Sequence, residues 1–219
     1  MLARDLINKS IPYLKNSDTG DKALDIMETY KISHLPVVDE KENFLGVISE
    51  NDIYFFNLEK KVIEKSKVIL KNFSVSPADH IFKVIRSFDK LKTTVIPVVE
   101  KEKYKGLISP LSVIKYLSVK PPIRQKGFAI IIKAGKKDYS PSKISSIIEI
   151  NKSKLLVLFY DEKEDSSEIF LKIESSDIES VIDGLEKNGF QTILLEQNTE
   201  KLDELYKERL DYFKKFVEI

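Results

Sequence analysis

Two short motifs carry the polar side chains with the clearest chemical potential in this sequence. The first runs Gly46-Val-Ile-Ser-Glu-Asn-Asp52, and the second runs Gly106-Leu-Ile-Ser-Pro-Leu-Ser112. In each motif a short apolar run ends at a serine, which is typical of a strand that turns into a helix. The start of a helix has unpaired backbone amides and the positive end of the helix dipole, and both favour a phosphate. The first motif therefore suggests an anion site to which Ser49 adds a hydroxyl donor.

Asp52 gives the first motif a second capability. An ionised carboxylate accepts hydrogen bonds and donates none, so it suits a ribose diol better than another anion. A plainer interpretation is that Asp52 is an acid in the first turn of a helix and that Ser49 caps this helix. These residues alone leave both interpretations open. The second motif has Ser112 in place of the acid, and Pro110 removes an amide beside Ser109, so we expect a weaker site there.

The composition argues against most chemistry. Lys and Arg number 36 against 35 Asp and Glu, so the excess of positive charge typical of nucleic-acid-binding proteins is missing. The chain has no Cys, which excludes disulfides, thiolate nucleophiles and cysteine-ligated zinc. Its two histidines, His34 and His80, lie far apart in the sequence. We therefore expect no catalytic residue, no metal site, no required cofactor and no nucleic-acid partner.

The distribution of apolar residues indicates a protein that works away from membranes. No run approaches the ~20 apolar residues that a membrane-spanning helix needs. The first nine residues contain charges and lack the long apolar core of a secretory signal. We expect a cytoplasmic location and no membrane partner.

The two motifs belong to an internal repeat. Pro36-Val-Val recurs as Pro97-Val-Val, 61 residues later, and Gly46 recurs as Gly106 after 60 residues. A predicted amphipathic helix precedes each copy. The first is capped by Asp18 or Thr19, and the second by Ser76 with Pro77 at its first position. Each copy therefore predicts a helix, a strand (35–39 or 96–100), a turn, a strand (44–49 or 105–109) and a helix.

The remainder of the chain follows a different pattern. Pro121-Pro122 marks a boundary. Strands are predicted at 127–133, 155–160, 168–174 and 190–195, and helices at 140–148 and 178–185. This order is that of the split βαβ or ferredoxin-like arrangement. The last predicted helix has one apolar side, formed by Leu202, Leu205, Tyr206, Leu210, Phe213, Phe216 and Val217.

The first motif, the Leu-Pro-Val-Val-Asp that precedes it and the duplication resemble the CBS domain, and two such domains in tandem resemble a Bateman module. The resemblance implies an α+β fold in which residues 1–59 and 60–120 are two CBS domains packed as a pseudo-symmetric pair. Residues 125–196 resemble an ACT domain in the order of their elements, and 197–219 would be a C-terminal amphipathic helix. This order of units is similar to that of acetoin-utilisation regulatory proteins.

The resemblance also implies a set of binding residues. In the CBS family the matching serine or threonine and the aspartate contact phosphate and ribose, and the Leu-Pro-Val region helps to surround the base. The residues implied for the first site are Ser49, Asp52, His34, Leu35, Pro36 and Ile11. The residues implied for the weaker second site are Ile96, Pro97, Ser109 and Ser112.

The function implied is that of a non-catalytic regulatory module. It would bind an adenine nucleotide of the AMP, ADP, ATP or S-adenosylmethionine class and transmit this through contacts in a homodimer or with an unknown protein partner. Two alternatives remain open. The chain could be a ligand-free dimerisation scaffold, or it could sense an amino acid through the ACT-like domain.

Overall fold

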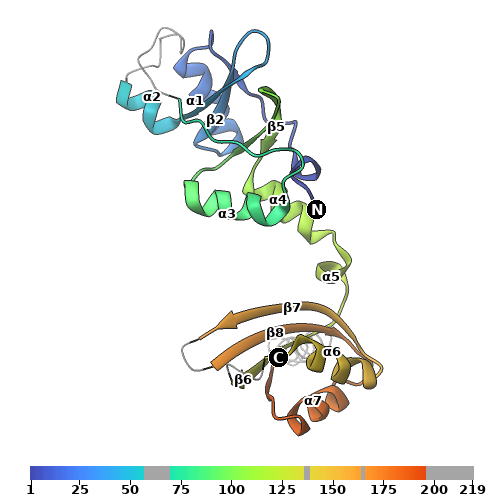
Figure 1. Cartoon of the computed structure of the whole chain (residues 1–219). Helices are drawn as coiled ribbons and strands as arrows, with labels where there is room; N and C mark the ends of the chain where they lie inside the picture. Colours follow the sequence, from blue (N-terminus) through green and yellow to red (C-terminus); the bar gives the residue numbers. More distant parts are fainter. Residues whose placement is uncertain (57–69, 136–138, 164–165, 196–219) are drawn as a thin grey trace, which may run out of the picture. The chain divides into compact units, whose positions relative to one another are not determined.

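The computed structural model describes residues 1–56, 70–135, 139–163 and 166–195. It divides into two compact units, Met1–Ser118 (unit 1) and Val119–Ile219 (unit 2), which are described separately below (Figure 1). The predicted C-terminal helix at 197–219 and the predicted boundary between residues 59 and 60 lie outside the described residues.

Unit 1 contains the two copies of the repeat. Its elements are η1 (Ala3–Leu6), β1 (Leu14–Lys15), α1 (Gly20–Tyr30), β2 (His34–Val38), β3 (Phe44–Ser49), α2 (Glu50–Phe56), α3 (Ile81–Leu91), β4 (Ile96–Glu100), β5 (Lys103–Ile108) and α4 (Pro110–Ser118). The strands form one sheet in the order β1-β2-β3 and a second sheet of β4 and β5. The predicted order of helix, strand, strand and helix is thus present in both copies.

The two antiparallel hairpins match in register. Pro36 pairs with Val47 in the first hairpin, and Pro97 pairs with Leu107 in the second. Each hairpin has one irregularity, between Val37 and Val38 or between Val98 and Val99, at equivalent positions. The repeat seen in the sequence therefore extends to details of the backbone.

The start of α3 differs from the prediction. The sequence suggested Ser76 as its cap, but α3 begins at Ile81 and its cap is His80, whose Nδ1 accepts from the Lys83 amide at 3.3 Å. Ser76 instead begins a turn in which its amide donates to Asp79 Oδ2 at 2.8 Å. In the first copy the equivalent cap is Thr19, one of the two residues that the sequence suggested for this role.

The chain segment that leads into each copy packs on the other copy. Ala3 and Leu6, from the N-terminal segment, belong to the core of the second copy. Asn8 pairs with Leu107 of the second copy, and Lys71 pairs with Val47 of the first. These crossings tie the two copies into one unit.

A glycine allows each crossing segment to approach. Gly46 has a φ of +147°, and a Cβ at this position would lie 2.6 Å from Cβ of Leu70. Gly106 has a φ of +138°, and its Cβ would meet Ile7 in the same way. Both glycines of the repeated motifs are therefore required by backbone conformation and by close packing.

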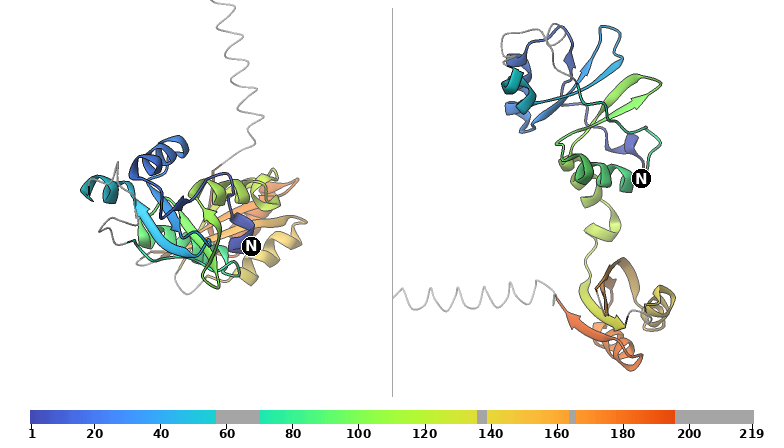
Figure 2. Two further views of the ribbon diagram at one scale, coloured as in Figure 1. Left: turned by 90° about the horizontal axis from the view of Figure 1, so that it is seen from above. Right: turned by 60° about the vertical axis from the view of Figure 1, so that its left-hand side comes forward.

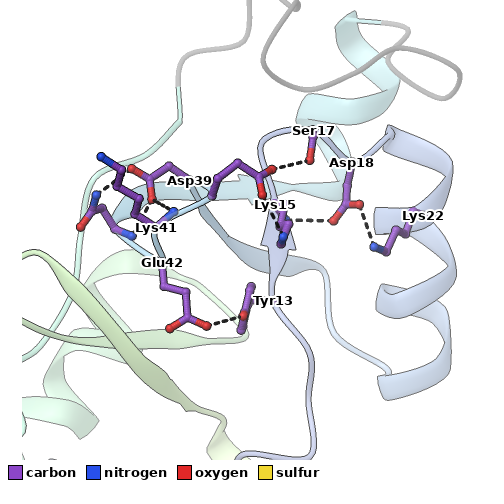
Figure 3. Close-up of polar contacts among 10 residues, drawn as sticks. Tyr13, Lys15, Ser17, Asp18, Lys22, Asp39, Lys41 and Glu42 are labelled. Atoms are coloured by element: carbon purple, nitrogen blue, oxygen red, sulfur yellow. Dashed lines mark hydrogen bonds and ion pairs between the residues drawn. The ribbon is translucent and has the colours of Figure 1, made fainter.

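Polar contacts fix the turn of the first hairpin against its surroundings (Figure 3). Asp39 Oδ1 accepts from the amides of Lys41 and Asn43, both at 2.8 Å. Glu42 accepts from the Tyr13 hydroxyl at 2.9 Å. The second hairpin joins this turn, because the Phe44 amide donates to the Glu102 carbonyl at 2.8 Å.

Unit 2 is a four-stranded sheet with two longer helices on one face (Figure 1, Figure 2). Its described elements are α5 (Pro121–Arg124), β6 (Phe128–Gly135), α6 (Pro141–Ile150), β7 (Lys154–Glu162), β8 (Ser166–Glu174), α7 (Ile178–Lys187) and β9 (Gln191–Leu194). The strands lie in the order β7-β8-β6-β9, and all neighbours are antiparallel. Its core is separate from the two cores of unit 1.

Candidate functional site

Ser49 and Asp52 are hydrogen-bonded to each other at the start of α2. The Ser49 hydroxyl donates to Asp52 Oδ2 at 2.5 Å, and the Ser49 amide donates to the same oxygen at 2.9 Å. In return, the Asp52 amide donates to the Ser49 hydroxyl oxygen at 3.2 Å. This is a capping box, in which the first residue and the residue three positions later satisfy each other's amides. The plainer interpretation of the motif therefore describes an interaction that is present.

The second motif forms the same box without a charge. The Ser109 amide donates to the Ser112 hydroxyl at 2.9 Å, and the Ser112 amide donates to the Ser109 hydroxyl at 3.2 Å. The two hydroxyl groups lie 2.9 Å apart. A neutral acceptor replaces the carboxylate without changing the backbone geometry of the helix start.

A cavity of about 320 Å³ lies against the Ser49–Asp52 box. Its lining from the first copy is Ser33, His34 and Ser49–Asp52, and its lining from the second copy is Lys71, Leu91 and Lys92. Lys92 is the left-handed residue that ends α3, with a φ of 49°. The cavity thus combines the capped start of one helix with the end of a helix from the other copy. We refer to it as the first cavity.

His34 lies in the wall of this cavity between the two copies. Its Nδ1 is 3.1 Å from the Ser33 hydroxyl and 3.2 Å from the Thr94 hydroxyl. Burial lowers the pKa of His34, the positive charge of Lys71 lowers it further, and the carboxylate of Asp52 opposes both. The imidazole is therefore held toward its neutral form, in which one ring nitrogen can accept a hydrogen bond.

A larger cavity of about 1360 Å³ lies against the second box. Its lining includes Ser109, Ser112 and, from the first copy, Asn8, Tyr30 and Lys31. Lys31 ends α1 in the left-handed conformation, as Lys92 ends α3. The two cavities are therefore built from equivalent parts of the repeat. We refer to this one as the second cavity.

The equivalent positions differ in charge. Asp52 of the first cavity corresponds to Ser112 of the second. Lys71, which pairs with Val47, corresponds to Asn8, which pairs with Leu107. The first cavity thus has an acid and a cation where the second has two neutral side chains. The second cavity has charged lining residues at other positions, among them Arg4, Lys9 and Lys115.

The structure separates the residues implied for the first site. His34, Ser49 and Asp52 line the first cavity. Leu35 is fully buried in the core of the first copy, and Pro36 is buried in β2. Ile11 packs against the same core but lines the second cavity, with Ser109 and Ser112.

The residues implied for the second site are separated in the same way. Ser109 and Ser112 line the second cavity. Ile96 is fully buried in the core of the second copy, and Pro97 is buried in β4. In both copies residues of the serine-containing motif line the cavity, while the Pro-Val strand is buried in the core.

Lys71 and Lys92 were missed by reasoning from the sequence. Both lie outside the motifs, in the second copy, and become neighbours of Asp52 only when the copies pack together. The available signal was the repeat itself, because Lys92 follows Lys31 by 61 residues. Two equivalent halves that pack face to face bring the helix end of one toward the motif of the other.

Two further observations concern the described residues as a group. They contain no cluster of three or more His, Asp or Glu side chains that could hold a metal ion. Within the same segments, no helix combines the length and the apolar character needed to cross a membrane.

Comparison with known proteins identifies the repeat. The model of the CBS domain matches residues 3–58 and 66–119. Inosine-5'-monophosphate dehydrogenase of Aquifex aeolicus (strain VF5) is 35% identical over 108 residues, which are 48% of this chain and 22% of that protein. The chain therefore corresponds to less than a quarter of this relative's length.

Two solved structures are among those to which this chain is similar. A CBS domain pair/ACT domain protein from Thermotoga maritima is 24% identical, with a TM-score of 0.46, and the match covers 53% of this chain and 96% of that one. CBSX2 in complex with AMP is 21% identical, with a TM-score of 0.45, and the match covers 54% of this chain and 98% of that one.

Proposed function

Because the chain belongs to the CBS domain family, of which it carries a tandem pair, we propose that it is a regulatory module that binds an adenine nucleotide in the first cavity. CBS pairs are generally regulatory and commonly bind adenine nucleotides. The observation that carries the proposal is that Asp52, Lys71 and Lys92 line one cavity. A nucleotide has a ribose diol that donates hydrogen bonds and a phosphate that carries negative charge, and this cavity offers a partner for each.

The roles of the side chains follow from the box. Both box hydrogen bonds to Asp52 end on Oδ2, so Oδ1 takes no part in the box and can accept from a ribose hydroxyl. The amides of Ser49 and Asp52 are bonded within the box. We therefore assign the phosphate to the ammonium group of Lys71 instead of the helix start, with Lys92, whose ammonium group already pairs with Asp89 at 2.6 Å, as a second positive charge at the rim. His34, which lines the same cavity, would contact the base or ribose.

The proposal includes transmission of the binding signal. The first cavity has walls from both copies of the repeat, so a ligand there binds a particular arrangement of the two copies. A ligand can shift a conformational equilibrium only by binding one state better than another. We propose that the arrangement of the two copies is the state that the nucleotide selects and that a protein partner in the cytoplasm detects.

Self-association is part of the same proposal. Helices of unit 1 expose large apolar side chains, including Phe55 (79% exposed), Phe82 (66%) and Ile114 (61%). Apolar groups exposed in this way are typical of surfaces that bind another protein. A homodimer formed through the helices of unit 1 would cover them.

For unit 2 we propose an ACT-like domain. The order β7-β8-β6-β9 and the helices on one face support this assignment, because they are those of the split βαβ arrangement. An amino-acid ligand remains an alternative for this unit. We propose that this domain spans residues 125–196. For the two CBS domains we propose the boundaries 1–59 and 60–120, on the basis of the repeat.

One observation favours a second function, that of a ligand-free scaffold. The side chains of both motifs are already used in capping boxes, and the second box works without an acid. A module used only for assembly would need the same serine, aspartate and hydroxyl groups to cap its helices, with no ligand involved.

Thermal unfolding distinguishes the two functions. The full chain would be heated with AMP, ADP, ATP, S-adenosylmethionine or an amino-acid mixture. A ligand at 100 times its dissociation constant adds ~2.7 kcal/mol to the stability of the folded state, which shifts the midpoint visibly. Stabilisation by an adenine compound supports nucleotide sensing, whereas no shift with any of them at millimolar concentration supports the scaffold. Stabilisation by an amino acid alone would assign sensing to unit 2.

A further inference from the structure

The sheet of unit 2 has one covered face and one open face. The burial pattern of β8 alternates strictly, with Ser167, Ile169, Leu171 and Ile173 buried. The last three of these residues join side chains of α6 and α7 in the core. The residues between them, among them Phe170, therefore point to the opposite face. On that face α5 is in contact with the sheet, since Lys172 Nζ donates to the Ile123 carbonyl at 2.7 Å, and no other described element of unit 2 covers it.

A row of apolar side chains crosses all four strands on the open face. The strand register pairs Phe159 with Phe170, Phe170 with Ile131, and Ile131 with Ile193. Phe159 is 64% exposed and Ile193 is 45% exposed. Four large apolar residues in one row form a continuous strip, which is a different situation from apolar residues scattered singly over a surface.

The neighbouring rows define the extent of the strip. On one side lie Val157, Lys172 and Ala129, followed by Leu195, whose amide donates to the Ala129 carbonyl. On the other side lie Asp161, Glu168, Lys133 and Gln191. The apolar area is thus bounded by polar residues at one end of the sheet. At the other end it continues to Leu195, which is 49% exposed and is the last described residue.

The sequence that follows Leu195 contains an apolar pattern whose length is sufficient to cover this strip. Residues 202–217 carry the apolar side already noted, with Leu202, Leu205, Tyr206, Leu210, Phe213, Phe216 and Val217 at helical spacing. A helix of this length would measure ~24 Å. Four adjacent strands span ~14 Å between the outer backbones, so such a helix would cross the whole sheet. Residues 196–201 are enough for the chain to turn back.

We propose that residues 202–217 of the same chain pack their apolar side on the open face, over the row formed by Phe159, Phe170, Ile131 and Ile193. The segment starts at the edge of the surface it would cover. Tethering by a short linker gives an effective concentration in the millimolar range. This favours the chain's own segment over a second molecule. Unit 2 would then be a three-layer structure, with helices on both faces of its sheet.

Tryptophan fluorescence tests the proposal, because the chain has no natural Trp. Phe170→Trp places a single reporter in the middle of the row. Phe213→Asp puts a charge on the apolar side of the segment, and Lys215→Asp puts the same side chain on its polar side as a matched control. We expect Phe213→Asp to shift the emission to longer wavelength, as water reaches the indole, and Lys215→Asp to leave it unchanged. Equal emission from both variants would overturn the proposal.

Crosslinking identifies which molecule supplies the segment and requires no charge on the apolar side. The chain has no Cys, so Lys172→Cys combined with Leu210→Cys provides one defined pair of thiols for a short bifunctional maleimide. Lys172→Cys with Glu208→Cys is the control on the polar side. Isotope-labelled and unlabelled protein are mixed before the reaction, and crosslinked peptides are analysed by mass spectrometry. We expect crosslinks within one chain, several-fold more of them for position 210 than for position 208. Crosslinks between chains, or equal yields at both positions, would overturn the proposal.

Discussion

The hydroxyl of Ser49 donates to Asp52 Oδ2 at 2.5 Å, while the amide of Asp52 donates back to the hydroxyl oxygen of Ser49 at 3.2 Å. This reciprocal pair gives the motif a structural role before any ligand is considered. It also orients the carboxylate of Asp52 at the wall of the first cavity. Structural and ligand-binding roles can therefore be separated by substitutions that preserve one and remove the other.

The structural role predicts unequal effects of two substitutions at Asp52. Asp52→Ala removes the acceptor of two hydrogen bonds, so we expect the free energy of unfolding to fall by about 1 kcal/mol, typical of a lost helix cap. Asp52→Asn keeps an oxygen acceptor and should lose less. Chemical denaturation followed by circular dichroism measures both. Ser112→Ala is the matched change in the second copy and should resemble Asp52→Ala. An Asp52→Ala variant as stable as the wild type would contradict the capping role.

Lys71 should act on the phosphate and not on the nucleoside. Its backbone pairs with Val47, which a change of side chain preserves, while its side chain faces the first cavity. A lost hydrogen bond to a charged group costs about 1.5–3 kcal/mol, so Lys71→Met should weaken binding of AMP roughly tenfold or more. Binding of adenosine should be almost unchanged. Lys90→Met, on α3 outside the cavity lining, is the control. Equal losses for AMP and adenosine in a calorimetric titration would argue against this role.

The pKa of His34 predicts how stability depends on pH. Burial, with the charge of Lys71, lowers this pKa in the folded state below its ordinary value of 6.5. The unfolded chain therefore binds a proton that the folded chain rejects, and the folded state loses stability as the pH falls below about 6.5. His34→Gln should flatten this part of the curve between about pH 7.5 and about pH 5.5.

The other histidine gives the control for this measurement. His80→Asn keeps a side-chain acceptor at the start of α3 and leaves His34 in place. Its stability curve should retain the loss of stability seen in the wild type. A curve for His34→Gln that is parallel to the wild-type curve would show that another group causes the pH dependence.

At Tyr104 we expect a substitution to increase the free energy of unfolding, whereas the substitutions at Asp52 are expected to lower it. Its hydroxyl is buried and has no hydrogen-bond partner among the described residues, and burial raises its pKa. An unsatisfied buried polar group costs about 1–3 kcal/mol. Tyr104→Phe should therefore raise the stability, since the edge contact of the ring with Tyr13, at 5.3 Å between centroids, would remain. Tyr13→Phe is the control, because it removes the exposed hydrogen bond to Glu42. Destabilisation by Tyr104→Phe would reveal a partner for the hydroxyl.

Much of the fold could be predicted from local patterns. Residues repeated at constant spacing, such as Gly46 and Gly106, identified the two copies because the same backbone requirement applies to both. The alternation of Ile169, Leu171 and Ile173 identified β8, since a strand directs successive side chains to opposite faces. The prediction of the start of α3 was wrong, because Ser76 and Asp79 form a separate turn whose sequence resembles a helix cap.

The candidate site was less accessible to sequence reasoning. The residues that matter most to its charge, Asp52 and Lys71, lie in different copies and meet only through packing. The sequence analysis assigned Ile11 to the first site, but the residue lines the second cavity. Its backbone precedes the first copy, but the crossing of the N-terminal segment carries it to the second cavity. A linear motif identifies residues within one element, whereas this cavity depends on how two equivalent halves face each other.

Nucleotide binding in the first cavity is tested most directly by a calorimetric titration of AMP into the full chain and into Asp52→Asn. The asparagine keeps the shape of the side chain and an acceptor for the capping box, but it removes the charge that we assign to the ribose diol. We expect one AMP bound per chain, with an affinity that falls roughly tenfold or more in Asp52→Asn, by the cost of one charge-assisted hydrogen bond. AMP binding of equal affinity in both proteins would show that the Asp52 carboxylate does not bind the ribose, and no binding of AMP, ADP, ATP or S-adenosylmethionine to the wild type would show that the first cavity is not an adenine-nucleotide site.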